Sequence, residues 1–170
     1  ALRTLPHVTL SGGRLPQQGK LLGIPPDLVT ELSRISDYVI VEADGSKGRP
    51  IKVHGDHEPV VPPSTTLFTV VVGADGLGKP LSPEWVFRFE RAKDLLRGNL
   101  TPESLMELIL RPEGLMKGKP PSARTFVFIN KAERTEAFLL ARRLSELLRR
   151  EGMEGAIGRA FFNRKVMEVF

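Results

Sequence analysis

The stretch Asp37–Gly48, DYVIVEADGSKG, decides the fold that this sequence predicts. A run of apolar, mostly β-branched residues ends abruptly in Glu42 and Asp44, followed by glycine and lysine. An uninterrupted apolar strand is typical of the middle of a parallel sheet, and ligands bind beyond the carboxyl ends of such strands in open α/β folds. We therefore expect a buried strand at Tyr38–Glu42 that carries its acids into a ligand site.

Glu42 and Asp44 are the first candidate catalytic residues and metal ligands. On a continuing strand they would share one face, about 7 Å apart at roughly 3.3 Å rise per residue. Hydrated Mg²⁺ takes one or two carboxylates together with substrate phosphates, so the acids followed by Gly45 and Lys47 indicate half of a nucleotide site. The alternative is a solvated strand end with a turn at Asp44-Gly45.

The composition predicts one domain with a substantial core. The 170 residues contain no cysteine, which excludes disulfides and thiolate metal sites, and the three histidines are too few and too scattered to favour a zinc site. No apolar run could span a bilayer and no export signal is visible, so we expect a cytoplasmic location and no membrane partner.

The formal net charge of +5 does not favour a nucleic-acid partner. Most of the excess falls after residue 123, where arginines recur at seven-residue spacing opposite an apolar stripe. A solvated helix face explains this pattern, and RNA binding stays a minor alternative that would require a steep salt dependence.

Strands and helices alternate along the chain without repeats, which predicts βαβ units and a mainly parallel sheet. Proline near a helix start and glycine after a helix end support several of the predicted helices. The predicted strands are His7–Leu10, Tyr38–Glu42, Leu67–Gly73, Arg124–Asn130 and Ala156–Phe162, and the predicted helices are Asp27–Ile35, Pro83–Arg97, Pro102–Leu110 and Thr135–Glu151.

The segment Gly13–Leu21 has the superficial look of a phosphate-binding loop that ends in Gly-Lys. Five residues rather than four separate its glycines, a proline interrupts it, and Leu21 stands where Ser or Thr would bind Mg²⁺. We therefore predict that it is not a P-loop.

Asn130-Lys131-Ala132-Glu133 follows a predicted strand and resembles the N-K-x-D base-recognition motif of GTP-binding proteins. Glu133 replaces the aspartate, which keeps a carboxylate for the base edge. We expect Asn130, Lys131 and Glu133 to bind a nucleotide base, whereas the alternative is a turn that enters a helix.

Several blocks in order resemble the YqeC family, whose members are named as accessory proteins of selenium-dependent molybdenum hydroxylases. The blocks are EADGSKGRPIK (42–52), EPVVP (58–62), VVGADGLGKPL (71–81), VFRFE (86–90) and GLMKGKPPSARTFVFINKAE (114–133). Members are similar to P-loop NTPases, a class that includes metallochaperone GTPases and dethiobiotin synthetase. The resemblance implies a three-layer α/β domain over residues 1–170 with a mainly parallel sheet and flanking helices, matching the C-terminal portion of such an NTPase.

The family opens with a glycine-rich G-K-T-T loop that this chain lacks, so we expect that the loop either precedes residue 1 or has been lost. The resemblance implies Glu42 and Asp44 as Mg²⁺ or water ligands. It also implies Lys47, Lys52 and Arg88 as phosphate or anion ligands. Arg88 could instead pair with Glu84 on its predicted helix.

The resemblance implies an NTP-dependent accessory or maturation factor for a selenium-dependent molybdenum hydroxylase, with Mg²⁺ and ATP or GTP as cofactors. Its partners would be a nucleotide and a hydroxylase client, and it would hydrolyse the nucleotide if a P-loop segment is present. The alternative is a non-catalytic module that holds an anionic cofactor or docks a partner enzyme.

Overall fold

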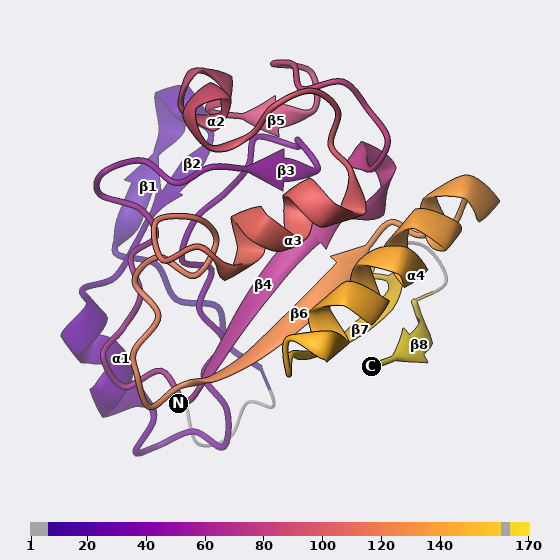
Figure 1. Cartoon of the computed structure of the whole chain (residues 1–170). Helices are drawn as coiled ribbons and strands as arrows, with labels where there is room; N and C mark the ends of the chain where they lie inside the picture. The colour runs from indigo at the N-terminus through magenta and orange to yellow at the C-terminus, as the bar shows by residue number, and fades with distance from the viewer. Residues whose placement is uncertain (1–6, 161–163) are drawn as a thin grey trace.

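A four-stranded sheet forms the centre of the molecule in the computed structural model, which describes residues 7–160 and 164–170. The strand order is β4-β6-β7-β8, with β4, β6 and β7 parallel and β8 antiparallel to β7 (Figure 1). Their bounds are β4 Leu67–Gly73, β6 Arg124–Asn130, β7 Glu154–Arg159 and β8 Lys165–Val169. The predicted strands at 67–73 and 124–130 are confirmed, and the chain is an α/β protein with parallel and mixed sheets flanked by helices.

Helices α3 (Pro102–Leu110) and α4 (Thr135–Arg150) cover one face of this sheet (Figure 1). Thr101 caps α3 by accepting a hydrogen bond from the Ser104 amide at 3.1 Å, and Gly152 follows α4 with a φ of 75°. Both helices begin and end close to the predicted positions because their caps and apolar stripes are local signals. Their buried side chains form the core with the strands, namely Leu105, Leu108, Ile109, Ala141, Leu144 and Leu148.

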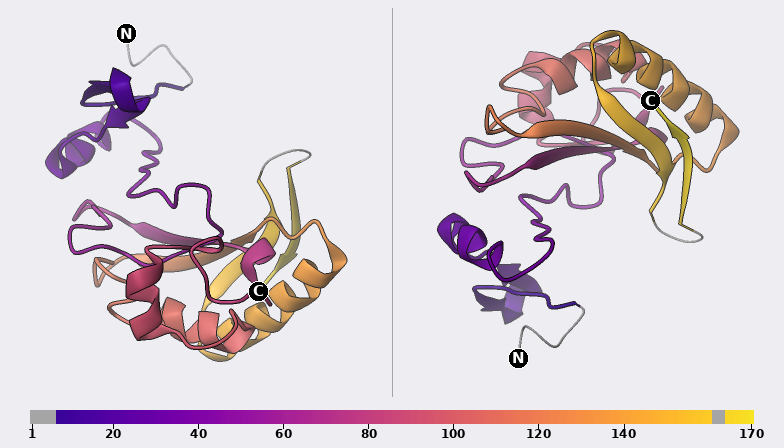
Figure 2. Two further views of the ribbon diagram at one scale, coloured as in Figure 1. Left: turned by 90° about the horizontal axis from the view of Figure 1, so that it is seen from above. Right: turned by 90° about the horizontal axis from the view of Figure 1, so that it is seen from below.

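The opposite face of the sheet corrects the expected three layers. Side chains along β4 alternate, so that Phe68, Val70 and Val72 are buried while Leu67 and Val71 are exposed. Figure 2 shows α2, α3 and α4 on the same side of the sheet, whereas α1 lies on the other side and apart from it. The described residues therefore build two layers, because no helix among them packs on the Val71 face.

A short second pair of strands lies beside the main sheet. β3 (Ile51–Lys52) pairs in parallel with β5 (Val86–Phe87), and α2 (Phe89–Leu95) follows directly. The helix predicted at Pro83–Arg97 is therefore wrong in its first half. The pairing with β3 holds residues 86–87 extended, and Arg88 then turns the chain into α2 with a left-handed φ of 62°.

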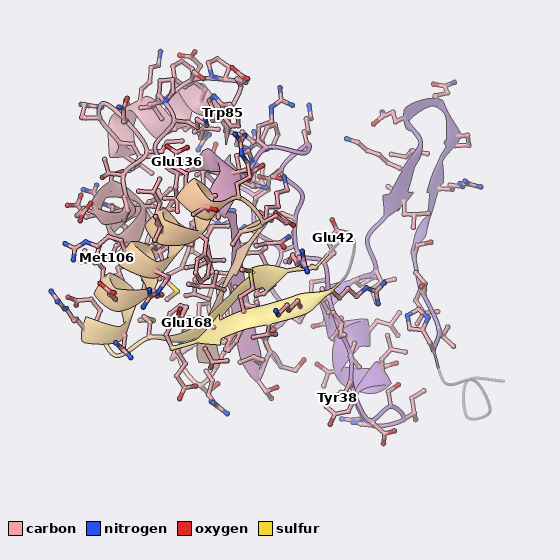
Figure 3. The ribbon with its side chains drawn as sticks, turned by 90° about the vertical axis from the view of Figure 1, so that its right-hand side faces the viewer. Tyr38, Glu42, Trp85, Met106, Glu136 and Glu168 are labelled. Atoms are coloured by element: carbon pink, nitrogen blue, oxygen red, sulfur yellow. The ribbon has the colours of Figure 1, made fainter. Side chains whose placement is uncertain are left out.

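The predicted strand at Tyr38–Glu42 is also wrong. These residues form no ladder with another strand, and Tyr38 and Ile40 are 89% and 95% exposed. A β-strand is stabilised by hydrogen bonds to a neighbouring strand, and no strand in the described part of the chain pairs with residues 38–42. Figure 3 shows Tyr38 and Glu42 on the irregular segment that leads from α1 toward the sheet.

The N-terminal segment folds as a hairpin and a helix. β1 (Gly13–Leu15) and β2 (Lys20–Leu22) pair antiparallel around a 3-10 turn, η2 (Pro16–Gln18), and α1 spans Pro26–Leu32. The residues examined as a P-loop thus form a hairpin, with no helix directly behind them. The expected strand at 7–10 is absent, and the expected short helix at 27–35 is present with nearby bounds.

The C-terminal strand predicted at 156–162 is found as β7, two residues earlier than expected, and residues 161–163 lie outside the described residues. β8 was missed because its residues give only a short alternating pattern. None of the described helices has both the length and the apolar character needed to cross a membrane.

Candidate functional site

A buried lysine marks the candidate site. Lys52 lies in β3 with 7% of its surface exposed, and its ammonium is 2.7 Å from Asp44 Oδ2 and 2.9 Å from Glu58 Oε2. It also donates a hydrogen bond to the Gly45 carbonyl at 3.0 Å. A buried charge is costly unless it is paired and hydrogen-bonded, so these contacts fix Lys52 and draw both carboxylates toward it.

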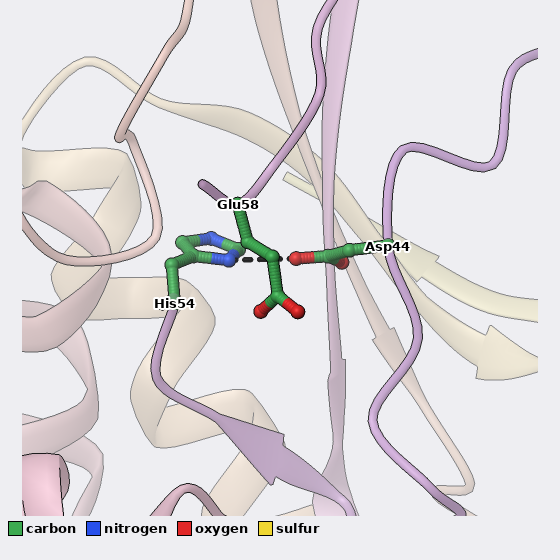
Figure 4. A group of neighbouring side chains, drawn as sticks. All are labelled: Asp44, His54 and Glu58. Atoms are coloured by element: carbon green, nitrogen blue, oxygen red, sulfur yellow. Dashed lines mark ion pairs between the residues drawn. The ribbon is translucent and has the colours of Figure 1, made fainter. Parts of the chain in front are cut away.

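His54 belongs to the same group. It follows Lys52, the last residue of β3, by two positions, and both side chains contact the Asp44 carboxylate. His54 Nδ1 lies 2.7 Å from Asp44 Oδ2, and its side chain is 8% exposed. Asp44, His54 and Glu58 approach one another from separate stretches of the chain (Figure 4).

Arg88 closes the group on its outer side. Its Nε and Nη2 donate to Glu58 Oε2 and Oε1 at 3.0 and 2.6 Å, a two-pronged pairing that suits guanidinium and carboxylate. Gly55 permits this arrangement, since a Cβ there would lie 2.9 Å from the Arg88 guanidinium carbon. The alternative pairing of Arg88 with Glu84 does not form, because residue 88 precedes α2 instead of continuing a helix.

The electrostatics follow from these contacts. Hydrogen bonds from Arg88 lower the pKa of Glu58 to about 2, with help from Lys52 and the Gly55 amide against an opposing effect of burial. Burial alone would raise the pKa of Asp44, but the close contacts with His54 and Lys52 outweigh it and hold that pKa below its ordinary value. Both groups are therefore carboxylates at neutral pH.

The three residues predicted to bind phosphate come together around one aromatic ring. The cationic groups of Lys47, Lys52 and Arg88 lie 5.3, 5.5 and 5.2 Å from the centroid of the Phe87 ring. Cations are attracted to the face of an aromatic ring, so Phe87 holds positive charge in place without neutralising it. Lys47 is exposed and accessible to an anion, whereas Lys52 and Arg88 are already paired with carboxylates.

A second group of predicted residues lies where β6 and β7 end. Asn130 Oδ1 accepts a hydrogen bond from the Ala160 amide at 2.9 Å, which ties the two strand ends together. Lys131 has a left-handed φ of 59° and pairs with Asp75 Oδ2 at 3.2 Å, and Glu133 is exposed. The second carboxylate oxygen of Asp75 is buried and lacks a hydrogen-bond partner.

The turn after β4 connects the two groups. The Gly73 amide donates to the Pro50 carbonyl at 2.8 Å, and Gly73 and Gly76 pack directly against Pro50. Asp75 lies in that same turn, η3 (Ala74–Gly76). The Lys52 group (Asp44, Lys52, His54, Glu58 and Arg88) and the Lys131 group (Asp75, Asn130, Lys131 and Glu133) therefore lie beside the same turn. This turn is at the carboxyl end of β4, the edge of the sheet where ligands bind in open α/β folds.

Glu42 does not join the group. It is exposed, and because residues 38–42 are not a strand, it does not share a sheet face with Asp44. His54 and Glu58 take part in its place, and Asp75 pairs with Lys131 in the second group. None of these three residues was expected from the sequence. The alternation of Lys52 with His54 was a usable signal, whereas the contacts of Glu58 and Asp75 depend on chain folding.

The comparisons with known proteins decide the family. The sequence model of the YqeC protein family matches residues 3–90. The "Uncharacterized protein YqeC" of Escherichia coli (strain K12) is 30% identical over 184 residues, which cover 94% of this chain and 71% of the relative. The chain belongs to the YqeC family. No solved structure matches it, so likeness to P-loop NTPases stays a prediction.

The YqeC match spans the Lys52 group completely. Residues 3–90 include Asp44, Lys52, His54, Glu58 and Arg88, whereas Asn130–Glu133 lie beyond the matched range. The Lys52 group thus lies in the part of the chain by which the family model identifies a YqeC protein.

Proposed function

We propose that this YqeC-family chain is an NTP-dependent accessory or maturation factor for a selenium-dependent molybdenum hydroxylase. The observation that carries the proposal is the convergence of Lys47, Lys52 and Arg88 on Phe87, beside the carboxylates of Asp44 and Glu58. A nucleotide with its metal ion needs both signs of charge in one place, cations for the phosphates and carboxylates for the ion.

Within this proposal each predicted residue keeps a stated role. Asp44 fits a cation ligand because its Oδ2 already holds the ammonium of Lys52 at 2.7 Å, and Glu42 lies two residues away as the second acid. Mg²⁺, when bound, would neutralise charge on the phosphates. Lys47, with its exposed ammonium, makes the first contact with an anion, and Lys52 and Arg88 position the phosphates.

The base would be held at the other side of the β4 turn. Asn130 is fixed by the Ala160 amide, Lys131 is held in its left-handed conformation beside Asp75, and Glu133 is free to accept hydrogen bonds from solvent or a base. A residue kept in an uncommon backbone conformation is often part of a binding site, which supports a ligand at this turn.

A non-catalytic binding module is the second candidate. It is favoured by the fact that Lys52 and Arg88 are already paired with Asp44 and Glu58, so that only Lys47 of the three cations around Phe87 is unpaired among the described residues. A site whose charges are mostly compensated suits the holding of an anionic cofactor, or the docking of a partner enzyme, as well as it suits hydrolysis.

Calorimetric titration of the chain with Mg·ATP and Mg·GTP tests nucleotide binding. We expect saturable binding that Lys47→Ala weakens at least about tenfold, since one charge-assisted contact contributes roughly 1.5–3 kcal/mol. Lys93→Ala is the matched control because Lys93 lies on α2 and pairs with Glu90. Absence of binding for both nucleotides, or equal loss in both variants, would contradict the proposal.

Hydrolysis separates the two candidates. In a protein that carries a G-K-T-T loop before residue 1, we expect Mg²⁺-dependent release of phosphate that Glu42→Gln abolishes. The binding-module alternative predicts a folded protein that binds its partner without hydrolysis and that the Glu42 substitution leaves unchanged.

A further inference from the structure

A buried nitrogen beside Lys52, His54 Nδ1, has no hydrogen-bond partner, whereas the neighbouring Asp44 Oδ2 is paired with the Lys52 ammonium. His54 Nδ1 and Asp44 Oδ2 lie 2.7 Å apart, but their relative direction is not that of a hydrogen bond. The imidazole is 8% exposed, so water does not satisfy its nitrogen freely. A buried imidazole nitrogen that lacks a hydrogen-bond partner and lies next to a carboxylate is available as a metal ligand.

Glu58 supplies a third ligand atom. One atom each from Asp44, His54 and Glu58 can be chosen so that all lie within 4.8 Å of one another (Figure 4). Ligands bound to one ion at about 2.1 Å lie at most about 4.2 Å apart. The ligand atoms therefore have to lie within that distance of one another, and His54 Nδ1 and Asp44 Oδ2, now 2.7 Å apart, have to separate slightly, which rotation of the side chains allows.

The position between the carboxylates already holds a positive charge. Lys52 Nζ contacts Asp44 Oδ2 at 2.7 Å and Glu58 Oε2 at 2.9 Å, and it is the group that a metal ion would displace. Lysine has four rotatable side-chain bonds, so its ammonium can leave while the backbone of β3 stays in place. An ion and Lys52 thus compete for the same two acids.

We propose that Asp44, His54 and Glu58 form a binding site for a divalent transition-metal ion of the Zn²⁺ or Mn²⁺ class, in competition with the ammonium of Lys52. Imidazole favours such ions over Mg²⁺, whereas the two carboxylates suit either kind, so the histidine decides the preference. This site shares Asp44 with the Mg²⁺ site expected at Glu42 and Asp44, but its other ligands are His54 and Glu58. It departs from the expectation that the histidines are too few and too scattered for a zinc site, since it uses one histidine with two carboxylates. It does not require a nucleotide, so it can hold or fail independently of the proposed function.

The first test is calorimetric titration of the chain with ZnCl₂ and with MnCl₂ in the absence of nucleotide. We expect one saturable site, with Mg²⁺ at least tenfold weaker than Zn²⁺, and at least tenfold weaker Zn²⁺ binding in His54→Gln. His57→Gln is the matched control, because His57 is exposed and lies outside the group. Equal binding by the two histidine variants, or no saturable site for either ion, would overturn the proposal.

The second test removes the competitor. Lys52→Met keeps the length and apolar stem of the side chain but not its charge, so we expect Zn²⁺ to bind at least tenfold more tightly than to the parent chain. Because the unpaired acids can also destabilise the fold, thermal melting is measured with EDTA and with Zn²⁺. The melting temperature of Lys52→Met should be lower than that of the parent in EDTA, and Zn²⁺ should raise it by more than it raises that of the parent. Lys93→Met serves as the control, and unchanged or weaker affinity in Lys52→Met would show that Lys52 and the ion do not compete.

Discussion

At the scale of single residues, the site depends on two very close approaches. Arg88 reaches Glu58 across Gly55, and the segment that carries Lys52 reaches the sheet across Gly73. At Gly73 a Cβ atom would lie 2.6 Å from Pro50 Cβ and 2.4 Å from Asp75 Oδ1. Contacts this short can be relieved only by moving the chain, so the glycine sets the distance between the loop and the strand end.

We predict that Gly73→Ala destabilises the protein by about 1–3 kcal/mol, the usual cost of forcing extra volume into a packed region. The displaced atoms include the backbone of Pro50, which cannot rotate away as a flexible side chain can. Urea denaturation followed by circular dichroism measures the change. Gly23→Ala is the control because no heavy atom lies within 4 Å of a Cβ there, and equal midpoints for the two variants would contradict the prediction.

At the scale of elements, α3 and α4 pack against the sheet and are linked to each other at their surface. Glu103 Oε1 accepts a hydrogen bond from Arg143 Nε at 3.1 Å, between the first turn of α3 and the middle of α4. A backbone amide at the start of α3 and then Arg143 hold the pKa of Glu103 below its ordinary value. The carboxylate therefore favours the folded state wherever it is ionised.

Because the pKa of Glu103 is lower in the folded chain than its ordinary value of 4.5, its contribution is present above pH 4.5 and is lost as the pH falls through the folded-state pKa. We predict that Glu103→Gln lowers the melting temperature at pH 7, by the equivalent of a few tenths of a kcal/mol for a half-exposed pair. The difference from the parent should close in acid. Glu107→Gln, on the same helix, should show a smaller effect, and a difference that grows below pH 4.5 would refute this reading.

The alternation along β4 gives a second test at this scale. Val72 is 2% exposed and packs in the core, whereas Val71 is 59% exposed on the uncovered face. We predict that Val72→Ala costs about 2 kcal/mol of unfolding free energy, and that Val71→Ala changes it by less than about 0.5 kcal/mol. Chemical denaturation of the two variants measures this contrast, and comparable losses would mean that the Val71 face is covered in solution.

At the scale of the whole molecule, the stability resides in the sheet and its helices. Between residues 7 and 42, Val29 is the one buried side chain, and Figure 2 shows β1, β2 and α1 apart from the sheet. The segment that joins the two parts carries Tyr38 and Ile40 in solvent and then enters the site at Asp44. Its connection to the rest includes a hydrogen bond from the Val60 amide to the Ala43 carbonyl at 3.3 Å.

We predict that Ile40→Ala leaves the thermal stability of this chain within about 0.5 kcal/mol of the parent, since the side chain is 95% exposed. Ile51→Ala removes the same atoms from a position that is 1% exposed and should cost about 2–5 kcal/mol. Thermal melting of both variants measures the two losses of stability. A large loss in Ile40→Ala would show that residues 38–42 are packed as a strand after all.

The sequence by itself determined the elements whose signals are local. The strands at 67–73 and 124–130, the capped helix at 102–110 and the long helix from residue 135 were predicted because their caps, apolar stripes and β-branched runs lie within a few residues of each other. The resemblance to the YqeC family, rather than these local signals, pointed to Lys47, Lys52 and Arg88 as basic residues near strand ends.

Only the tertiary structure decided which segments pair with which, and therefore which of the predicted elements form. Residues 38–42 have the composition of a buried strand. Because no other strand among the described residues pairs with them, Tyr38 and Ile40 stay exposed. Residues 86–87 became a strand through pairing with β3 and interrupted a predicted helix. The group of Asp44, His54 and Glu58 likewise exists only because the loops on either side of β3 fold onto Lys52, a buried charge that binds the nearest carboxylates whatever their distance in sequence.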